Sequence, residues 1–166
     1  MASSTTSDAE IAEQPPPARR VGHLFPGSST KLDQETVPTT RILVIDDDQL
    51  IRNTIERALV DDETTVDTAS DGLDGIRLLR TNDYAVVLLD LMMPSLSGFA
   101  VIEFLQHEQP AKLERVIVMT SRKLDDTNRV VNVDFTGRLL RKPFKEKDLK
   151  AMVARRLKKT ASFERR

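Results

Sequence analysis

One apolar run constrains the fold of this chain more than any other feature. Residues 84–89 read Tyr-Ala-Val-Val-Leu-Leu, the run stops abruptly at Asp90, and a loop with Pro94 and Gly98 follows. A short continuous apolar run that contains β-branched residues and ends in such a loop is typical of a strand covered on both faces, as in a parallel sheet. Asp90 then lies at the carboxyl edge of that strand, where open α/β sheets place their sites.

From Arg41 onward, strand patterns alternate with helix patterns. Apolar or alternating segments predict strands at residues 42–45, 64–69, 84–89, 115–119 and 136–141. Apolar residues at helical spacing predict helices near residues 51–59, 73–79, 98–109, 124–133 and 149–157. This alternation predicts an α/β fold: a doubly wound five-stranded parallel sheet of the flavodoxin-like (βα)5 type, with strand order 2-1-3-4-5. A barrel is not expected, because it needs eight such units.

Composition suggests three regions. Residues 1–40 are rich in Ser, Thr and Pro and show no sustained period, so we expect a disordered or linker extension. Its small apolar cluster of Val21, Leu24 and Phe25 leaves a short docking motif as the alternative. Residues 41–159 form the expected domain, and residues 160–166 a short basic tail. The basic run at residues 155–159 is either the solvated face of a terminal helix or a patch that binds a partner or nucleic acid.

Charge and cysteine content limit the class of protein. The 166 residues carry a net charge of -1, so nothing in the total indicates nucleic acid or membrane as a partner. The absence of Cys excludes disulfides and thiolate metal sites, and it fits a reducing compartment. We find no secretory signal pattern and no apolar run long enough to span a membrane, and we therefore expect a cytoplasmic protein.

Polar side chains follow four of the predicted strands where each strand ends. They are Asp46, Asp47 and Asp48 after the first strand, Asp90 after the third, Thr120 after the fourth and Lys142 after the fifth. In the predicted strand order the first and third strands are neighbours, so Asp46, Asp47 and Asp90 should converge. Carboxylates this close repel one another, and a hard cation such as Mg²⁺, with Lys142 as a second positive charge, would relieve the repulsion. Such a cluster suits phosphoryl transfer, and a carboxylate can also serve as the nucleophile. Asp48 is better explained as the cap of the first helix.

Four motifs resemble the receiver domain of two-component response regulators. They are Ile45-Asp46-Asp47-Asp48, the segment Leu88–Pro94 with Gly98, Met119-Thr120-Ser121 and Lys142-Pro143-Phe144. The resemblance implies a Mg²⁺-dependent switch in which a histidine kinase or a histidine phosphotransfer protein phosphorylates Asp90. It also implies metal binding by Asp47 directly, by Asp46 partly through water, by Asp90, and by the backbone carbonyl of Met92. Thr120 and Lys142 would bind the phosphoryl group, and the Lys142–Pro143 bond would be cis.

The sequence also departs from the family pattern. Leu139 stands where receivers usually carry a Tyr or Phe that rotates on activation, and Val133-Asp134-Phe135 replaces a turn of small residues. These positions lie on the face that commonly passes the signal on in the family. We therefore expect this chain to retain phosphorylation better than the family's standard output mechanism. The chain ends without an effector domain, so we expect a single-domain regulator that acts on another, unidentified protein. The alternative is a receiver-like scaffold whose contacts do not depend on phosphate. No enzymatic activity is expected beyond self-catalysed phosphotransfer and dephosphorylation.

The resemblance implies that the side chains two residues after Asp90 and two residues after Thr120 flank the approach of water to the phosphoryl group. They are Met92, which is apolar, and Arg122, whose guanidinium could shield phosphoryl oxygens. The pair predicts slow self-dephosphorylation, accelerated by up to about tenfold in Arg122→Ala. The alternative is that Arg122 points into solvent.

Overall fold

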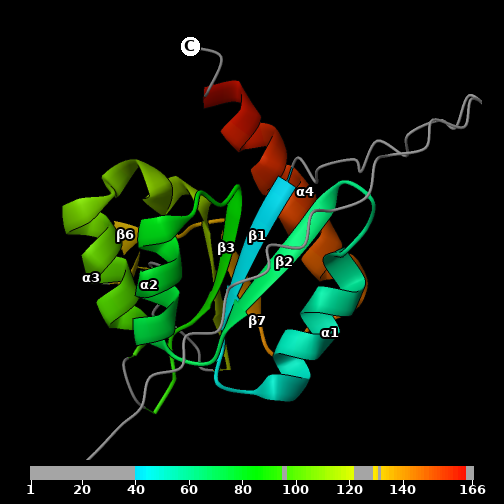
Figure 1. Cartoon of the computed structure of the whole chain (residues 1–166), viewed down its shortest axis with the longest axis horizontal. Helices are drawn as coiled ribbons and strands as arrows, with labels where there is room; N and C mark the ends of the chain where they lie inside the picture. Colours follow the sequence, from blue (N-terminus) through cyan, green and yellow to red (C-terminus); the bar gives the residue numbers. More distant parts are fainter. Residues whose placement is uncertain (1–39, 95–96, 122–128, 131, 164–166) are drawn as a thin grey trace, which may run out of the picture. The chain divides into compact units, whose positions relative to one another are not determined.

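The computed structural model describes residues 40–94, 97–121, 129–130 and 132–163 (Figure 1). Along the chain the elements are β1 (Thr40–Ile45), α1 (Gln49–Leu59), β2 (Thr64–Ala69), α2 (Gly72–Thr81), β3 (Val86–Asp90), α3 (Gly98–Glu108), the 3-10 helix η1 (Pro110–Arg115), β4 (Val116–Thr120), β5 (Arg129–Val130), β6 (Val133–Asp134), β7 (Leu139–Arg141) and α4 (Glu146–Phe163).

The five-stranded sheet has the order β2-β1-β3-β4-β7, and all its strands are parallel. With β7 counted as the fifth strand, this is the predicted order 2-1-3-4-5, and the predicted fold class is confirmed. β7 begins at Leu139 rather than at Thr136, because the chain turns just before it: Gly137 has a φ of 72°, which glycine tolerates best.

Helices cover both faces of the sheet (Figure 1). Side chains alternate along a strand, so β1 and β3 each contribute to two separate cores. Leu43, Ile45, Val87 and Leu89 pack on the side of α2 and α3, whereas Ile42, Val44, Val86 and Leu88 pack on the side of α1 and α4. This double burial explains why residues 84–89 are continuously apolar. No helix in the described part of the chain is long and apolar enough to cross a membrane.

The helix predicted at residues 124–133 is wrong where the structure describes that stretch. Arg129–Val130 and Val133–Asp134 pair as an antiparallel hairpin, β5–β6, while residues 124–128 and 131 lie outside the described residues. Asn132, in the turn, has a φ of 63°, a conformation that a right-handed helix cannot include and that Asn adopts more readily than most residues. After the hairpin, Phe135 is fully buried in the core on the α2 and α3 side.

A partly buried polar network links the starts of β1 and β3 to β2. The Tyr84 hydroxyl donates to Asp67 Oδ2 at 2.7 Å, and Arg41 Nη2 donates to the same oxygen at 2.6 Å. Arg41 Nη1 also donates to the side-chain oxygen of Asn82 at 3.0 Å. Burial raises the pKa of the Tyr84 hydroxyl, and the hydrogen bond and negative charge of Asp67 raise it further.

This network predicts the alkaline titration of the protein. Tyr84 is the only tyrosine in the chain, so the tyrosinate absorbance reports on this residue alone. We expect no ionisation of the folded protein near the ordinary tyrosine pKa of about 10. Because the unfolded chain ionises first, the free energy of unfolding should fall as the pH rises above that value.

Asp67→Asn removes the charge but keeps an acceptor, and it should move the titration of Tyr84 to lower pH. A wild-type midpoint near the ordinary value, unchanged in Asp67→Asn, would contradict the network.

Candidate functional site

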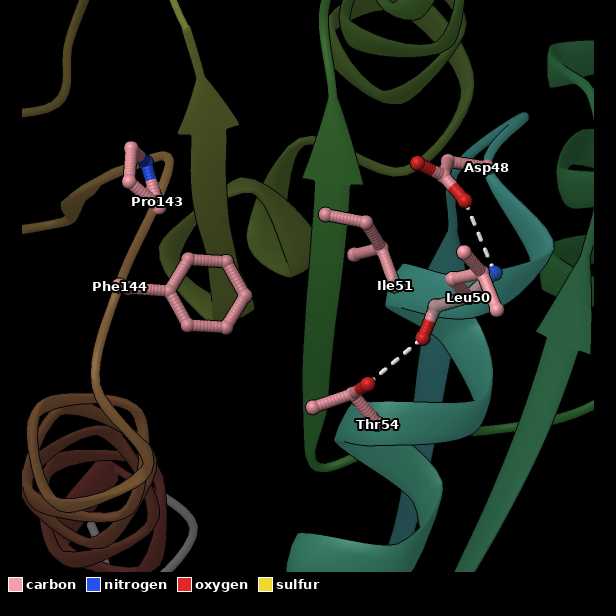
Figure 2. Close-up of a pocket in the computed structure, with 6 residues that line it drawn as sticks. All are labelled: Asp48, Leu50, Ile51, Thr54, Pro143 and Phe144. Atoms are coloured by element: carbon pink, nitrogen blue, oxygen red, sulfur yellow. Dashed lines mark hydrogen bonds between the residues drawn. The ribbon is translucent and has the colours of Figure 1, made fainter.

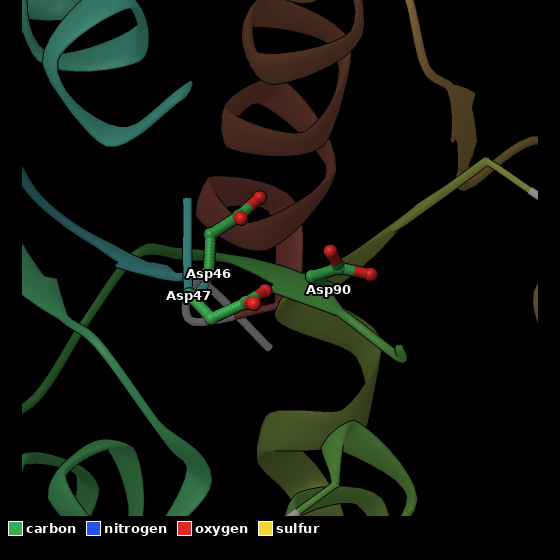
Figure 3. A group of neighbouring side chains, drawn as sticks. All are labelled: Asp46, Asp47 and Asp90. Carbon is green, nitrogen blue, oxygen red and sulfur yellow. The ribbon is translucent and has the colours of Figure 1, made fainter. Parts of the chain in front are cut away.

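Three aspartates converge at the carboxyl edge of the sheet (Figure 3). Asp46 and Asp47 directly follow β1, and Asp90 is the last residue of the neighbouring strand β3. One carboxylate oxygen from each lies within 4.8 Å of the other two. Asp46 and Asp90 are buried, and Asp47 is exposed. The structure thus brings together the carboxylates that the strand order places side by side.

Lys142 joins two of these carboxylates from the end of β7. Its Nζ donates to Asp46 Oδ2 at 2.6 Å and to Asp90 Oδ2 at 2.5 Å. Burial alone would lower the pKa of Lys142, but its hydrogen bonds and ion pairs with Asp46 and Asp90 outweigh burial and raise it. Burial also raises the pKa of Asp46, an effect that its hydrogen bond from Lys142 opposes. The Lys142–Pro143 peptide bond is cis, as the resemblance implies.

The backbone that carries Asp46 and Asp47 is held by Arg52 of α1. Arg52 Nη1 donates to the carbonyl oxygen of Asp46 at 2.6 Å and to that of Asp47 at 3.0 Å. Asp48 caps α1, because its Oδ1 accepts from the Leu50 N–H at 2.8 Å. The capping role expected for Asp48 is confirmed. Sequence reasoning missed Arg52, although its position four residues after the cap places it one helical turn above the loop.

The remaining residues predicted for the site are Met92, Thr120, Leu139 and Arg122. Asp90 Oδ1 accepts from the Met92 N–H at 2.9 Å, and the Met92 side chain is exposed beside the site. Thr120 ends β4, next to β3, and is buried. Leu139 begins β7 and packs against the core on the α2 and α3 side. Arg122 lies outside the described residues.

The site has the composition that a hard divalent cation requires. Three carboxylates and one ammonium leave two negative charges in excess, and two of the carboxylates are buried. Oxygen donors in such an arrangement suit Mg²⁺, which keeps positions open for water and phosphate oxygens. The carboxylate of Asp90 contacts the Lys142 ammonium, and the buried Thr120 ends the neighbouring strand β4, so the edge offers both a nucleophile and groups that could bind an anion.

Gly98 fixes the backbone of Asp90 from the start of α3. A Cβ at this position would lie 2.1 Å from the Asp90 carbonyl oxygen and 2.7 Å from Leu91 Cα. Both atoms belong to the backbone, so no side-chain rotation could relieve the overlap. Only glycine lets the first turn of α3 pack this closely on the site.

Gly98→Ala should therefore destabilise the protein by about 1–3 kcal/mol, the usual cost of overpacking. Urea unfolding of the purified variant measures this change. Ser97→Ala is the matched control, because the Ser97 side chain makes no capping hydrogen bond to α3. Equal stability of the two variants would show that the close packing does not constrain the site.

Residues 42–154 match the family described as the response regulator receiver domain. The transcriptional regulatory protein DltR of Streptococcus agalactiae is 33% identical over 73% of this chain and 53% of its own length. The transcriptional regulatory protein HprR of Escherichia coli is 33% identical over 71% of this chain and 52% of its own length. The chain thus spans about half the length of the curated relatives it matches.

Solved structures show the same fold. The receiver domain of the Francisella response regulator 1452 aligns with a TM-score of 0.60 and 26% identity, over 73% of this chain and 98% of that one. The chemotaxis protein CheY4 of Vibrio cholerae aligns with a TM-score of 0.61 and 21% identity, over 70% of this chain and 98% of that one. At this identity, the second match bears on the fold alone.

Proposed function

The chain belongs to the response regulator receiver domain family, and on that premise we propose that it is a phosphorylation switch whose acceptor is Asp90. Receiver domains are signalling switches rather than classical enzymes. The observation that carries the proposal is the position of Asp90, at the end of β3, within 4.8 Å of Asp46 and Asp47 and in contact with Lys142.

Receiver domains generally bind Mg²⁺ in an acidic pocket. In this chain we assign the ion to the carboxylates of Asp46, Asp47 and Asp90, with the carbonyl of Met92 as a further ligand. The excess negative charge of the cluster supports this assignment. A bound ion supplies positive charge to the oxygens of the transferred phosphoryl group.

The proposed step forms an acyl phosphate. A carboxylate oxygen of Asp90 attacks the phosphorus of a phosphohistidine on a histidine kinase or a histidine phosphotransfer protein. The new P–O bond replaces the P–N bond, and the imidazole nitrogen leaves with the electron pair. Lys142 then pairs with the phosphoryl oxygens, and the Thr120 hydroxyl donates a hydrogen bond to one of them.

The remaining assignments are also proposals. We place the receiver at residues 41–159, preceded by the extension 1–40 and followed by a tail at 160–166, although α4 itself continues to Phe163. Output would pass to a separate protein in the cytoplasm, without direct nucleic-acid contact. The scaffold alternative draws support from the hairpin β5–β6, which occupies a stretch where a helix was expected. Slow self-dephosphorylation, with Arg122 as a shield and Met92 beside the acceptor, stays a prediction.

Labelling with a small phosphodonor such as acetyl phosphate tests the acceptor. We expect Mg²⁺-dependent incorporation that is lost on addition of a chelator and in Asp90→Asn. Asp48→Asn is the matched control, because Asn keeps the cap of α1 while removing the same charge from the loop. Comparable labelling of Asp90→Asn, or labelling that needs no Mg²⁺, would overturn the proposal.

The rim of the site offers a surface for the phosphodonor. An open pocket of about 240 Å³ lies between the start of α1 and the loop after β7, and its lining residues are Asp48, Leu50, Ile51, Thr54, Pro143 and Phe144 (Figure 2). Leu50 is 76% exposed, more than the other exposed large apolar side chains of the described residues. A donor that brings its histidine to Asp90 must cover this rim, so we propose that the donor places an apolar side chain against Leu50.

Leu50→Ala should slow phosphotransfer from a histidine phosphotransfer protein by about tenfold and leave labelling by acetyl phosphate unchanged. Leu73→Ala is the control, because Leu73 is 69% exposed on α2, outside this pocket. Equal loss with both donors would indicate damage to the site itself. No loss with the protein donor would place docking elsewhere.

A further inference from the structure

Three basic side chains surround one carboxylate at the amino edge of the sheet, opposite the three aspartates. The Glu114 cluster consists of Glu114 in η1, Arg138 just before β7, and Arg156 and Lys159 in α4. Glu114 Oε1 lies 3.6 Å from Arg138 Nη2, and Oε2 lies 3.5 Å from Arg156 Nη1 and 3.4 Å from Lys159 Nζ. The Glu114 carboxylate thus pairs with three cations, and each pair is separated by 3.4 Å or more.

The two arginines of the cluster are buried while their shared anion is not. The side chains of Arg138 and Arg156 are 6% and 9% exposed, compared with 49% for Glu114 and 54% for Lys159. Burial of a charge is costly unless a partner compensates it. The positive charges of Arg138 and Arg156 therefore lie close to the protein interior and share the half-solvated carboxylate of Glu114, while Asp134 is a further negative charge near Arg138.

The guanidinium of Arg138 has hydrogen-bond partners for its buried donors, whereas in the described part of the chain that of Arg156 lacks them. Arg138 Nη1 donates to the Leu113 carbonyl at 2.6 Å, Nη2 donates to the Asp134 carbonyl, and the guanidinium lies over the Phe135 ring at 4.6 Å from its centre. The Nε and Nη1 atoms of Arg156 are buried, and neither has a hydrogen-bond partner among the described residues. Buried donors without a partner are rare in folded proteins.

An exposed basic helix face does not account for this arrangement. Arg155, next in sequence, is exposed and needs no partner because water solvates it. An ordered water could accept a hydrogen bond from Arg156, but it would not offset the charge. A phosphate group supplies both acceptors and negative charge, and its oxygens match the planar fork of a guanidinium.

We propose that the Glu114 cluster binds a phosphate group, which displaces the carboxylate of Glu114 and pairs with Arg156 and Lys159. Displacement is feasible because Glu114 is half exposed and holds its partners only at 3.4 Å or more. When its side chain turns outward, it uncovers Arg156 Nη1. Free phosphate and a phosphorylated side chain of another protein offer the same chemistry. The proposal does not rest on the function of Asp90, which lies at the other edge of the sheet.

Titration of the full chain with inorganic phosphate tests this site. The buffer contains a chelator, so that the metal-free carboxylates repel the anion, and the arginine Nε–H signals are followed by NMR. We expect saturable shifts of the Arg156 signal. Lys159→Ala should weaken binding by about tenfold, the value of one charge-assisted hydrogen bond, whereas Glu114→Gln should tighten it because a competing charge is removed.

Arg155→Ala is the matched control, since it removes one exposed positive charge from the same helix, and it should change the affinity less than twofold. Equal weakening in Arg155→Ala and Lys159→Ala would overturn the proposal by showing diffuse attraction to a basic helix. Weaker binding in Glu114→Gln, or no saturation in the wild type, would also overturn it. A phosphoserine peptide that binds more tightly than free phosphate, with its unphosphorylated twin inactive, would support a protein-borne phosphate.

Discussion

The contact of the Lys142 ammonium with the carboxylates of Asp46 and Asp90 is the interaction on which the site depends. These three residues come from the ends of β7, β1 and β3, so the parallel order of the sheet must be complete before they can meet. One ammonium cannot neutralise three carboxylates, and burial makes the remaining repulsion more costly. Arg52 holds the loop by donating to the carbonyl oxygens of Asp46 and Asp47 and not to their carboxylates, which leaves the carboxylate oxygens available to a cation.

The strands and the convergence of Asp46, Asp47 and Asp90 were predictable because both follow from local patterns. A strand buried on two faces must be continuously apolar, and parallel strands end at the same edge. The contacts of Gly98, Arg52 and Glu114 were not predictable in this way. Glu114 meets Lys159, which is 45 residues away in the chain, and no period in the sequence encodes such a pair. The incorrect prediction of a helix at residues 124–133 rested on weak apolar spacing that a hairpin also satisfies. Asn132, a residue that favours turns, was the sequence signal for the hairpin.

The departures from the family pattern fall on one part of the molecule. Phe135 is buried in the core where receivers carry a small turn, and Arg138 stacks on its ring, so this turn is a fixed part of the packing. Leu139 has no ring to rotate, and its side chain packs against the same core as Phe135. The carboxyl edge, by contrast, keeps every residue that the resemblance assigns to chemistry. The proposed acceptor site and the surface that would pass on its signal are therefore under different constraints in this chain.

The two clusters at the edges of the sheet have opposite charge imbalances. In the cluster at the carboxyl edge the Lys142 ammonium meets three carboxylates, and in the Glu114 cluster one carboxylate pairs with three cations. α4 starts four residues after Lys142 and carries Arg156 and Lys159 in its second half. Its 18 residues span about 27 Å at 1.5 Å per residue. α4 packs against β7 and α1 and also against η1, which carries Glu114. The same helix therefore contacts elements that support both clusters.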